Sequence, residues 1–273
     1  MSDAAGVAPA ARRRSGPLRF AILGSGSRGN ALLVECRQTR LLIDCGFGLR
    51  ETDKRLARLG IEPDTLTAIV LTHEHGDHAN GAGALARRNR IPLWMTAGTS
   101  HALGAAVCDA IPVLRQFGSH EHFAIGDIEL QPFTVPHDAR EPCQFVFSDG
   151  VRRLGLLTDV GHITSHIETQ LQGCDGLILE CNHDPDLLAD SAYPPSLKAR
   201  IGGPHGHLDN EAAAALLARL DHGRLQHIVA AHLSEKTNTP WLARTALGAS
   251  LGGEAARVEI ASQDGGLLWR ELV

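Results

Sequence analysis

Hydrophobic positions along the chain fall into short runs that alternate with helical patterns. Apolar runs at residues 18–23, 31–35 and 40–44 predict three strands in quick succession, of which the last two form a hairpin. Residues 51–59 have an amphipathic pattern that stops before Gly60, a residue that commonly follows the end of a helix. We therefore expect a helix there.

The alternation continues through the rest of the chain. A buried strand is expected at residues 68–71, followed by a helix that starts near Asp77 and runs to about Arg88. Further strands are expected at residues 92–95, 128–135, 144–147, 154–158, 177–179, 227–230, 257–261 and 267–270, and further helices at 210–220 and 238–248. This order predicts an α/β fold with two mixed sheets flanked by helices, an αβ/βα four-layer sandwich.

Composition adds to this picture. Of the 273 residues, 43% are hydrophobic but only 4% are aromatic, so the core is expected to be mostly aliphatic. The basic cluster at residues 12–14 follows an Ala-rich stretch, which is the wrong order for a signal peptide. We expect residues 1–16 to be a disordered tail and residues 17–273 to be a single domain. No run of 18 apolar residues occurs, so no membrane span is predicted.

Charge and reactive side chains narrow the function. A net charge of −5 does not suggest a strongly basic nucleic-acid binder, although it leaves room for a local basic groove. The six cysteines include no C-x-x-C pair, so we interpret them as reduced thiols of a cytoplasmic protein. The fifteen histidines are the unusual feature of the composition.

A glycine-rich segment imitates a dinucleotide-binding fingerprint. Gly24, Gly26 and Gly29 match G-x-G-x-x-G after a strand, and Asp44 lies about twenty residues further on. That fingerprint needs a helix directly after the glycines, because the helix N-terminus holds the pyrophosphate. Two β-type runs follow here instead. A turn between two strands is favoured, and no dinucleotide is expected.

The segment at residues 69–78 carries the strongest chemical signal. An apolar strand ends and four side chains that can bind metal follow within six residues: His73, His75, Asp77 and His78. The first two lie two apart in an extended loop, so their imidazoles can face the same way. The last two open the next helix and can turn to a neighbouring point, which suits two adjacent metal ions. A polar loop with incidental histidines would not account for this order of ligands.

H-x-H-x-D-H after a buried strand resembles the signature of the metallo-β-lactamase superfamily. The resemblance implies an earlier Asp at a strand end, then a lone His, a lone Asp and a final His. The chain has them in this order: Asp44, His137, Asp159 and His232.

Carried over to this chain, the resemblance implies two divalent metal ions, zinc or manganese. One ion would be bound by His73, His75 and His137. The other would be bound by Asp77, His78 and His232. Asp159 would bridge the two ions, and Asp44 would orient ligands without binding metal.

A finer resemblance, to the YycJ (WalJ) subgroup, extends over almost the whole chain from residue 18. The similar stretches are LGSGSRGNALLVE, LTHEHGDHANG, VPHDAREP, TDVGHIT, LECNHDPDLL, GGPHGHLDNEAAA and AAHLSEKTNTP. Members of this subgroup are metal-dependent 5′ exonucleases, so the resemblance implies a nucleic-acid substrate, DNA rather than RNA. Arg28 and Asp209 stand where the subgroup usually has serine, and Thr237 where it usually has asparagine. These differences concern substrate contacts and leave the metal ligands intact.

Glu180 and His207 are similar in layout to the Glu and His loops of the ribonuclease Z group. In that group the Glu orients the His, which helps to protonate the leaving oxygen. By this resemblance Glu180 and His207 are candidate catalytic residues beside Asp77. The alternative is that Glu180 caps a loop and His207 caps the following helix. His162 and His183 are either pocket residues or structural ones.

These inferences together predict a phosphodiester hydrolase in which a hydroxide between two metal ions attacks phosphorus. The interval between Asp159 and His232 is short and is assigned to the strands and helix named above, so no second domain is expected to cover the metals. A small-molecule or cyclic-nucleotide phosphodiesterase is an open alternative, and a metal-stabilised binding module is a lesser one. The sequence predicts no oligomeric state.

Overall fold

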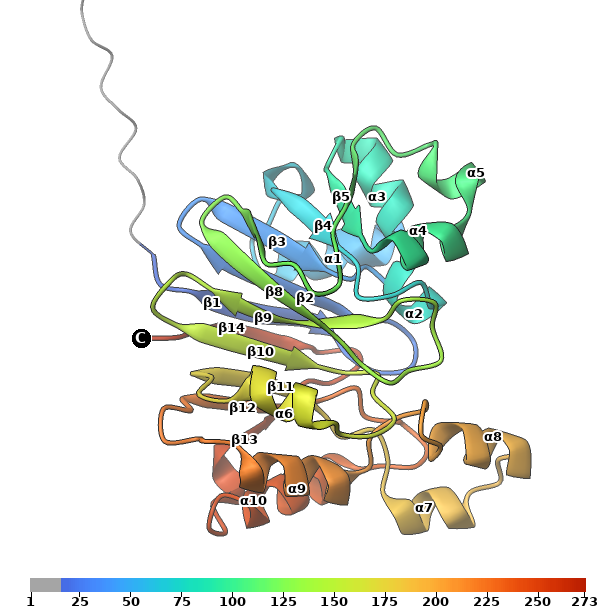
Figure 1. Cartoon of the computed structure of the whole chain (residues 1–273), viewed down its shortest axis with the longest axis vertical. Coiled ribbons are helices and arrows are strands. Elements are labelled where there is room, and N and C mark those ends of the chain that lie inside the picture. Colours follow the sequence, from blue (N-terminus) through green and yellow to red (C-terminus); the bar gives the residue numbers. More distant parts are fainter. Residues whose placement is uncertain (1–15) are drawn as a thin grey trace, which may run out of the picture.

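The structure, a computed structural model, describes residues 16–273, so the tail expected at residues 1–16 lies outside the described residues except for Gly16. The described residues form two seven-stranded sheets that face each other (Figure 1). The strands of the first sheet, in spatial order, are β14 (Leu267–Glu271), β1 (Arg19–Gly24), β2 (Ala31–Cys36), β3 (Thr39–Ile43), β4 (Ala68–Val70), β5 (Leu93–Met95) and β6 (Leu114–Gln116). Those of the second are β13 (Val258–Ile260), β12 (His227–Ala231), β11 (Gly176–Glu180), β10 (Arg153–Leu157), β9 (Cys143–Ser148), β8 (Ile128–Thr134) and β7 (Phe123–Ile125).

Both sheets are mixed. The strands β1, β2 and β3 pair antiparallel, and β3 to β6 pair parallel. In the second sheet β7 to β10 pair antiparallel, and β10 to β13 pair parallel. Strand β14 returns to the first sheet and pairs antiparallel with β1. The expected pair of mixed sheets is therefore confirmed.

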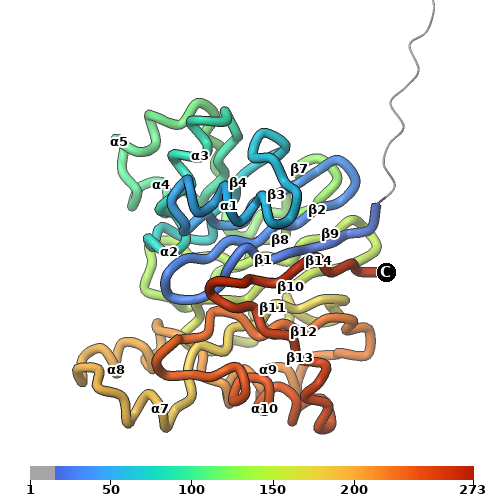
Figure 2. Tube along the Cα trace, turned by 180° about the vertical axis from the view of Figure 1, so that it is seen from behind, coloured from blue at the N-terminus to red at the C-terminus, as the bar shows by residue number. Residues whose placement is uncertain are grey.

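Helices cover the outer face of each sheet (Figures 1 and 2). On the side of the first sheet these are α1 (Leu49–Arg58), α2 (Gly76–Ala79), α3 (Ala82–Asn89), α4 (Ala97–Leu103) and α5 (Ala105–Cys108). On the side of the second sheet they are α6 (Ser165–Leu171), α9 (Asn210–Arg219) and α10 (Pro240–Ala249), while α7 (Pro185–Asp190) and α8 (Pro195–Ile201) lie at an edge of the fold. None of these helices is long and apolar enough to cross a membrane.

The core lies in three apolar layers because most strands are buried on both faces. In β2, Leu32 and Val34 point toward the opposite sheet, where they share a cluster with Phe145 of β9. Leu33 points the other way and packs in the cluster of the first sheet and its helices, with Leu56 of α1. The strict alternation of a half-exposed strand is therefore absent, as expected for strands covered on both sides.

The prediction of one continuous helix from Asp77 to about Arg88 is wrong. The segment is broken into α2 and α3 at Gly81, where a Cβ atom would lie 1.9 Å from the carbonyl oxygen of Phe47. The backbone N–H of Gly81 donates to the carbonyl of Cys45 instead of continuing the helix. Close contact with the segment after β3 thus ends α2 after one turn.

The interval between Asp159 and His232 also departs from expectation. Besides the predicted β11, α9 and β12 it contains α6, α7 and α8. Helices α7 and α8 form an excursion between β11 and α9. It projects beside the edge of the fold at which the candidate site, described below, is located (Figure 1). Each has only six or seven residues, too few to show a helical period in the sequence.

Candidate metal centre

The residues expected to bind metal come from both sheets and meet at one edge of the fold. The loop after β4 and helix α2 carry four of them: His73, His75, Asp77 and His78. The loops after β8, β10 and β12 carry the other three: His137, Asp159 and His232. Because the two sheets contribute different residues, only the assembled fold brings the cluster together.

Three strand ends at this edge have an unusual backbone conformation. Asp44 after β3, Asp159 after β10 and His232 after β12 have φ angles of 60°, 54° and 55°. Left-handed backbone is uncommon for residues other than glycine, and a residue held there costs roughly 1–3 kcal/mol. The chain accepts this cost at three positions of one cluster. Strain of this kind is found mostly where function requires a fixed geometry.

Close backbone contacts position Asp77. A Cβ atom on Gly46 would come within 1.8 Å of the Asp77 carbonyl oxygen, so this position has no room for a side chain. The backbone N–H of Asn30 donates to the same carbonyl at 2.8 Å, and the Asn30 amide lies 3.3 Å from Asp77 Oδ2. Asn30 ends the glycine-rich segment, which is a turn between β1 and β2 as predicted. That segment supports the cluster of expected ligands through Asn30, and no helix follows it.

The expected ligands form groups whose donor atoms lie within 4.8 Å of one another. The first triad consists of His73, His75 and His137. The second triad consists of Asp77, His78 and His232. Asp159 lies between the triads, with Oδ2 3.2 Å from His78 Nε2 and Oδ1 4.0 Å from His137 Nε2. The grouping has the expected division, and the role of each residue as a ligand stays a prediction.

In the second triad both imidazoles are held by carboxylates. His78 Nδ1 lies 2.8 Å from Asp44 Oδ2, and His232 Nδ1 lies 2.9 Å from Glu180 Oε1. A carboxylate only accepts hydrogen bonds, so each histidine carries its proton on Nδ1. The Nε2 lone pairs are then free for a metal, and the carboxylates increase the basicity of the rings.

In the first triad the partners are neutral. His137 Nδ1 donates to the carbonyl of Gly206 at 3.1 Å. His73 Nδ1 lies 2.9 Å from the hydroxyl of Thr72, whose own proton is donated to Asp44. Both rings therefore also direct Nε2 toward the cluster. His75 differs, because its Nδ1 faces His137 Nε2 at 3.2 Å.

Three of the facing atoms are buried and have no hydrogen-bond partner among the described residues: His73 Nε2, Asp159 Oδ2 and His232 Nε2. A buried polar atom without a partner costs about 1–3 kcal/mol, so three at one point need a common explanation. Imidazole nitrogens and carboxylate oxygens are ligands that zinc and manganese accept. The five histidines and two aspartates therefore fit a pair of divalent cations.

The carboxylates dominate the electrostatics of the cluster. Burial tends to lower the pKa of His232, but the charge of Asp159 and the nearby carboxylates of Asp77 and Glu180 outweigh it and raise this pKa to about 10. The pKa of His73 is lowered well below its ordinary value, first by burial and then by the charge on His78. Without metal, protons on histidines offset the buried negative charge. Bound cations would take the place of these protons.

Glu180 ends β11 and accepts four hydrogen bonds. Its Oε1 accepts from Nδ1 of His207 and of His232, both at 2.9 Å. Its Oε2 accepts from the backbone N–H groups of Val160 at 3.0 Å and Leu208 at 3.1 Å. Burial tends to raise the pKa of Glu180, but the charge on His207 and the hydrogen bonds from both histidines hold it at about 2. A fully satisfied, ionised carboxylate thus links two loops to the cluster.

His207 faces the cluster and does not cap the next helix. Helix α9 is capped by Asp209, whose side chain accepts from the N–H of Ala212 at 2.7 Å. The ring of His207 lies 5.2 Å from the ring of His232, and its side chain is 23% exposed. Burial tends to lower the pKa of His207, but the charge of Glu180 and their hydrogen bond raise it. The helix-capping alternative is therefore wrong, and a partly exposed imidazole with a raised pKa faces the cluster.

Several supporting residues were missed by sequence reasoning. Thr72 and Asn30 bind ligands of the cluster, although only the position of Thr72 directly before His73 hints at this. His183 is buried beside Asn182, and His162 is exposed and donates to the carbonyl of Pro204. Neither of these two histidines joins a donor group.

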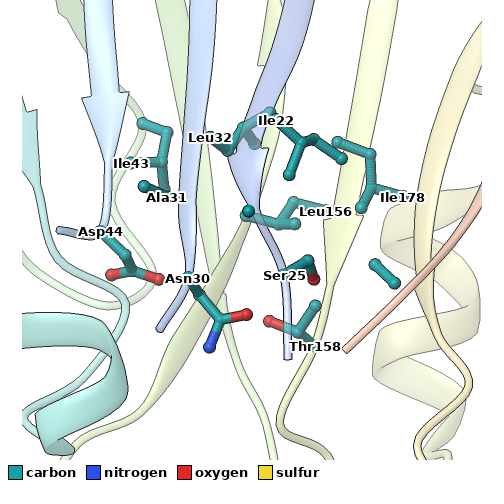
Figure 3. Close-up of a pocket in the computed structure, with 12 residues that line it drawn as sticks. Ile22, Ser25, Asn30, Ala31, Leu32, Ile43, Asp44, Leu156, Thr158 and Ile178 are labelled. Carbon is teal, nitrogen blue, oxygen red and sulfur yellow. The ribbon is translucent and has the colours of Figure 1, made fainter. Parts of the chain in front are cut away.

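A small cavity of about 30 Å³ lies between the sheets directly behind the cluster (Figure 3). Asp44, Asn30, Ser25 and Thr158 line its outer end, where the strands stop. Aliphatic side chains such as Leu156 line its inner end. The cavity marks the boundary between the apolar core and the polar residues that support the candidate metal centre.

Two mixed sheets with a His/Asp cluster at their shared edge define the class of the protein. The family described as a β-lactamase superfamily domain matches residues 39–228. The chain belongs to the metallo-β-lactamase superfamily and is a hydrolase of that superfamily.

Within the superfamily the chain is similar to the exodeoxyribonuclease YycJ of Bacillus anthracis. The two are 36% identical over 231 residues, which cover 83% of this chain and 86% of the relative. Among solved structures, the metallo-β-lactamase fold protein YhfI from Bacillus subtilis has a TM-score of 0.71 at 18% identity. Zn²⁺-bound PqqB from Methylobacterium extorquens has a TM-score of 0.71 at 17% identity. Both comparisons cover 93% of this chain and 100% of the other, and at these identities they show the fold alone.

Proposed function

We propose that this hydrolase is a 5′ exonuclease on DNA that uses two divalent ions, zinc or manganese. One observation carries the proposal: both triads, Asp159 and the Glu180–His207 pair lie together at one partly exposed edge of the fold. The similarity to a relative named exodeoxyribonuclease supports DNA as the substrate. All six cysteines are free thiols, which supports our placement of the reaction in the cytoplasm.

When bound, the two cations would lower the pKa of a water molecule and neutralise charge on a phosphate. Asp77 is suited to a second task beside binding metal. Its Oδ2 lies 3.5 Å from Nε2 of both His78 and His232, and its side chain is 27% exposed. An exposed carboxylate at this point can also accept a proton from the attacking water.

His207 is suited to the opposite transfer. Because Nδ1 donates to Glu180, the other ring nitrogen is left to carry a proton toward the substrate. The charge of Glu180 favours the protonated ring. The leaving oxygen of a DNA strand is a poor leaving group without a proton, so a positioned acid accelerates this step.

A cation at the mouth of the site favours an anionic substrate. Arg200 of α8 donates to Asp138 at 2.7 Å, and Asp138 Oδ1 lies 3.6 Å from His137 Nε2. The Arg200 side chain is 62% exposed. The excursion of α7 and α8 thus carries a solvated guanidinium to the rim of a protein whose net charge is negative.

The test compares two end labels on one linear DNA duplex, digested by the manganese-loaded protein and its Asp77→Ala variant. A 5′ exonuclease releases a 5′ label at once as mononucleotide, while a 3′ label stays on a strand that shortens progressively. Asp53→Ala is the matched control, since Asp53 pairs with Arg88 on the surface. We expect wild type and control to digest the duplex and Asp77→Ala to fail.

Absence of DNA turnover in a preparation shown to carry two metal ions would overturn the proposal. Hydrolysis of bis(p-nitrophenyl) phosphate by that same preparation would then point to small phosphodiesters as the substrate class. Release of the 3′ label first would instead correct the polarity.

A further inference from the structure

A second hollow opens beside the cluster, at the carboxyl ends of β12 and β13. It is a crevice of about 390 Å³ lined by the loop after β12 and the turn after β13. This volume lies within the roughly 300–1,000 Å³ of small-molecule sites. In open sheets, ligands commonly bind outside the carboxyl ends of parallel strands. The position and the size are therefore those of a binding site.

The crevice is lined by residues that adjoin His232 of the candidate metal centre. Leu233 and Ser234, which directly follow His232 in the chain, line it. Ser25 lines it as well, and its hydroxyl accepts the backbone N–H of His232 at 2.8 Å. A ligand held at the cluster would therefore have this crevice as its neighbour.

The lining combines an apolar surface with hydrogen-bonding edges. Leu233, Pro240 and Ile260 provide the apolar part. The hydroxyls of Ser234 and Ser262 accept backbone N–H groups, which leaves their own protons available for a ligand. A flat, weakly polar ring with donors and acceptors on its edge matches such a surface.

Two carboxylates border the crevice. Glu235 and Asp264 line it, and both bind the guanidinium of Arg28, at 2.9 Å and 3.1 Å. Asp264 also lies 3.7 Å from the guanidinium of Arg55, so the carboxylates are paired with cations, and their oxygen atoms can still accept hydrogen bonds from ring and amino N–H groups. Arg28, which departs from the subgroup pattern, therefore holds together the loops that border the crevice.

An exposed aromatic residue directly follows the lining of the crevice in the chain. Trp241 comes after Pro240 in the first turn of α10 and is 69% exposed. Exposed tryptophan is unusual in a chain with so few aromatic residues. Aromatic side chains of this kind stack on bases of single-stranded nucleic acids.

We propose that this crevice binds a nucleobase of the strand whose phosphate lies at the candidate metal centre, with Trp241 stacking at its rim. The inference rests on the proposed function and extends it. The enzyme would recognise an unpaired end, because a base inside a duplex cannot enter a crevice.

The kinetic test uses single-stranded hexanucleotides of deoxyadenosine in which each of the first three bases is removed in turn. Stacking of one base contributes about 1–3 kcal/mol, so wild type should prefer the intact strand over one abasic strand by about fivefold to 160-fold in kcat/KM. The preference should be lost in Trp241→Ala and in Ser262→Phe, whose ring fills the crevice. Both positions are exposed, so folding should not depend on them. Leu268→Ala on β14 removes an equally exposed apolar side chain elsewhere and should keep the preference.

A binding test separates this inference from the proposed function. Deoxyadenosine has no phosphate, and its titration should quench tryptophan fluorescence in the wild type but not in Ser262→Phe. If the wild type digests no DNA, the proposed function fails, and quenching alone decides whether the crevice binds a base. The inference is overturned if deoxyadenosine causes no quenching, or if intact and abasic strands are digested equally well at every position.

Discussion

The two triads of the candidate metal centre are similar in composition but differ in what lies behind them. Behind the second triad, Asp44 and Glu180 bind His78 and His232 directly. Behind the first triad the partners of His73 and His137 are a hydroxyl and a backbone carbonyl. The fifth histidine, His75, has a side chain that is 29% exposed.

This difference predicts unequal metal binding. Carboxylates behind imidazoles raise their basicity and fix their orientation, and the second triad also contains the charge of Asp77. We therefore expect the second triad to bind its cation more tightly than the first. Similar ligand sets can thus be distinguished by the groups that they contact on the side away from the metal.

Removal of the Asp159 carboxylate, which lies between the triads, is expected to have the largest effect on metal content and DNA hydrolysis. Asp159→Asn keeps a residue type that tolerates the left-handed backbone at this position, but it removes the charge between the triads. We expect fewer than two metal ions per chain after dialysis and a loss of DNA hydrolysis beyond the ~100-fold typical of outer-shell changes. Elemental analysis and rates of nucleotide release measure both, with Asp53→Asn as the control. A variant that keeps two ions would show that the triads bind independently.

A variant of His207 tests the proposed general acid, which is linked to His232 of the second triad through Glu180. His207→Ala should lower kcat for DNA by about 100-fold, because a general acid contributes roughly 10²–10⁴-fold. The loss should be much smaller for bis(p-nitrophenyl) phosphate, whose leaving group needs no proton. His162→Ala, in an exposed histidine that binds the adjacent Pro204 carbonyl, is the matched control. Equal losses on both substrates would assign His207 a structural role.

Asp44 tests whether the carboxylate makes the second triad the stronger site. Asp44→Asn also tolerates the left-handed backbone, and it should weaken the second site by about 10–100-fold. Calorimetric titration of the metal-free protein with Mn²⁺ resolves the two sites. The first site should weaken less, since His73 reaches Asp44 only through Thr72. The opposite order of losses would reverse the comparison of the triads.

The substitution Thr72→Val is expected to have the smallest effect on metal affinity. It removes the hydroxyl between His73 and Asp44 with little change of shape in a fully buried position. A hydrogen bond contributes about 0.5–1.5 kcal/mol, so the first site should weaken by about threefold to tenfold while the second is unchanged. The same titration measures it. A larger effect at the second site would mean that Thr72 acts mainly by holding Asp44.

The sequence predicts the residues of the cluster better than it predicts the residues that hold them in place. Residues 73–78 lie in one short segment, the loop after β4 and the start of α2, so their joint position follows from local spacing. The contact between Thr72 and Asp44 depends on the parallel pairing of β3 with β4, and that between Asn30 and Asp77 on the turn after β1. No local pattern carries such information, because partners far apart in the chain meet only through the sheet.

The same reason explains which elements were predicted. Most strands of both mixed sheets follow from apolar runs that are long enough to recognise, but β6 and β7, which are short and mostly not buried, were not predicted. The break at Gly81 depends on the carbonyl of Phe47, which lies in another segment. The excursion of α7 and α8 consists of short helices with no periodic apolar face. Features that depend on contacts made only in the folded state could thus not be predicted from the sequence.

The pairing of β14 with β1 has a consequence for how the chain is made. Phe20 faces Arg270 and Ile22 faces Leu267, although a ribosome synthesises the two strands almost a whole chain length apart. Until β14 emerges, the free edge of β1 can pair with another nascent copy. Strand β1 leads into the turn that holds Asn30 against Asp77. The last of the described strands in chain order therefore completes the sheet that supports the first four of the expected ligands.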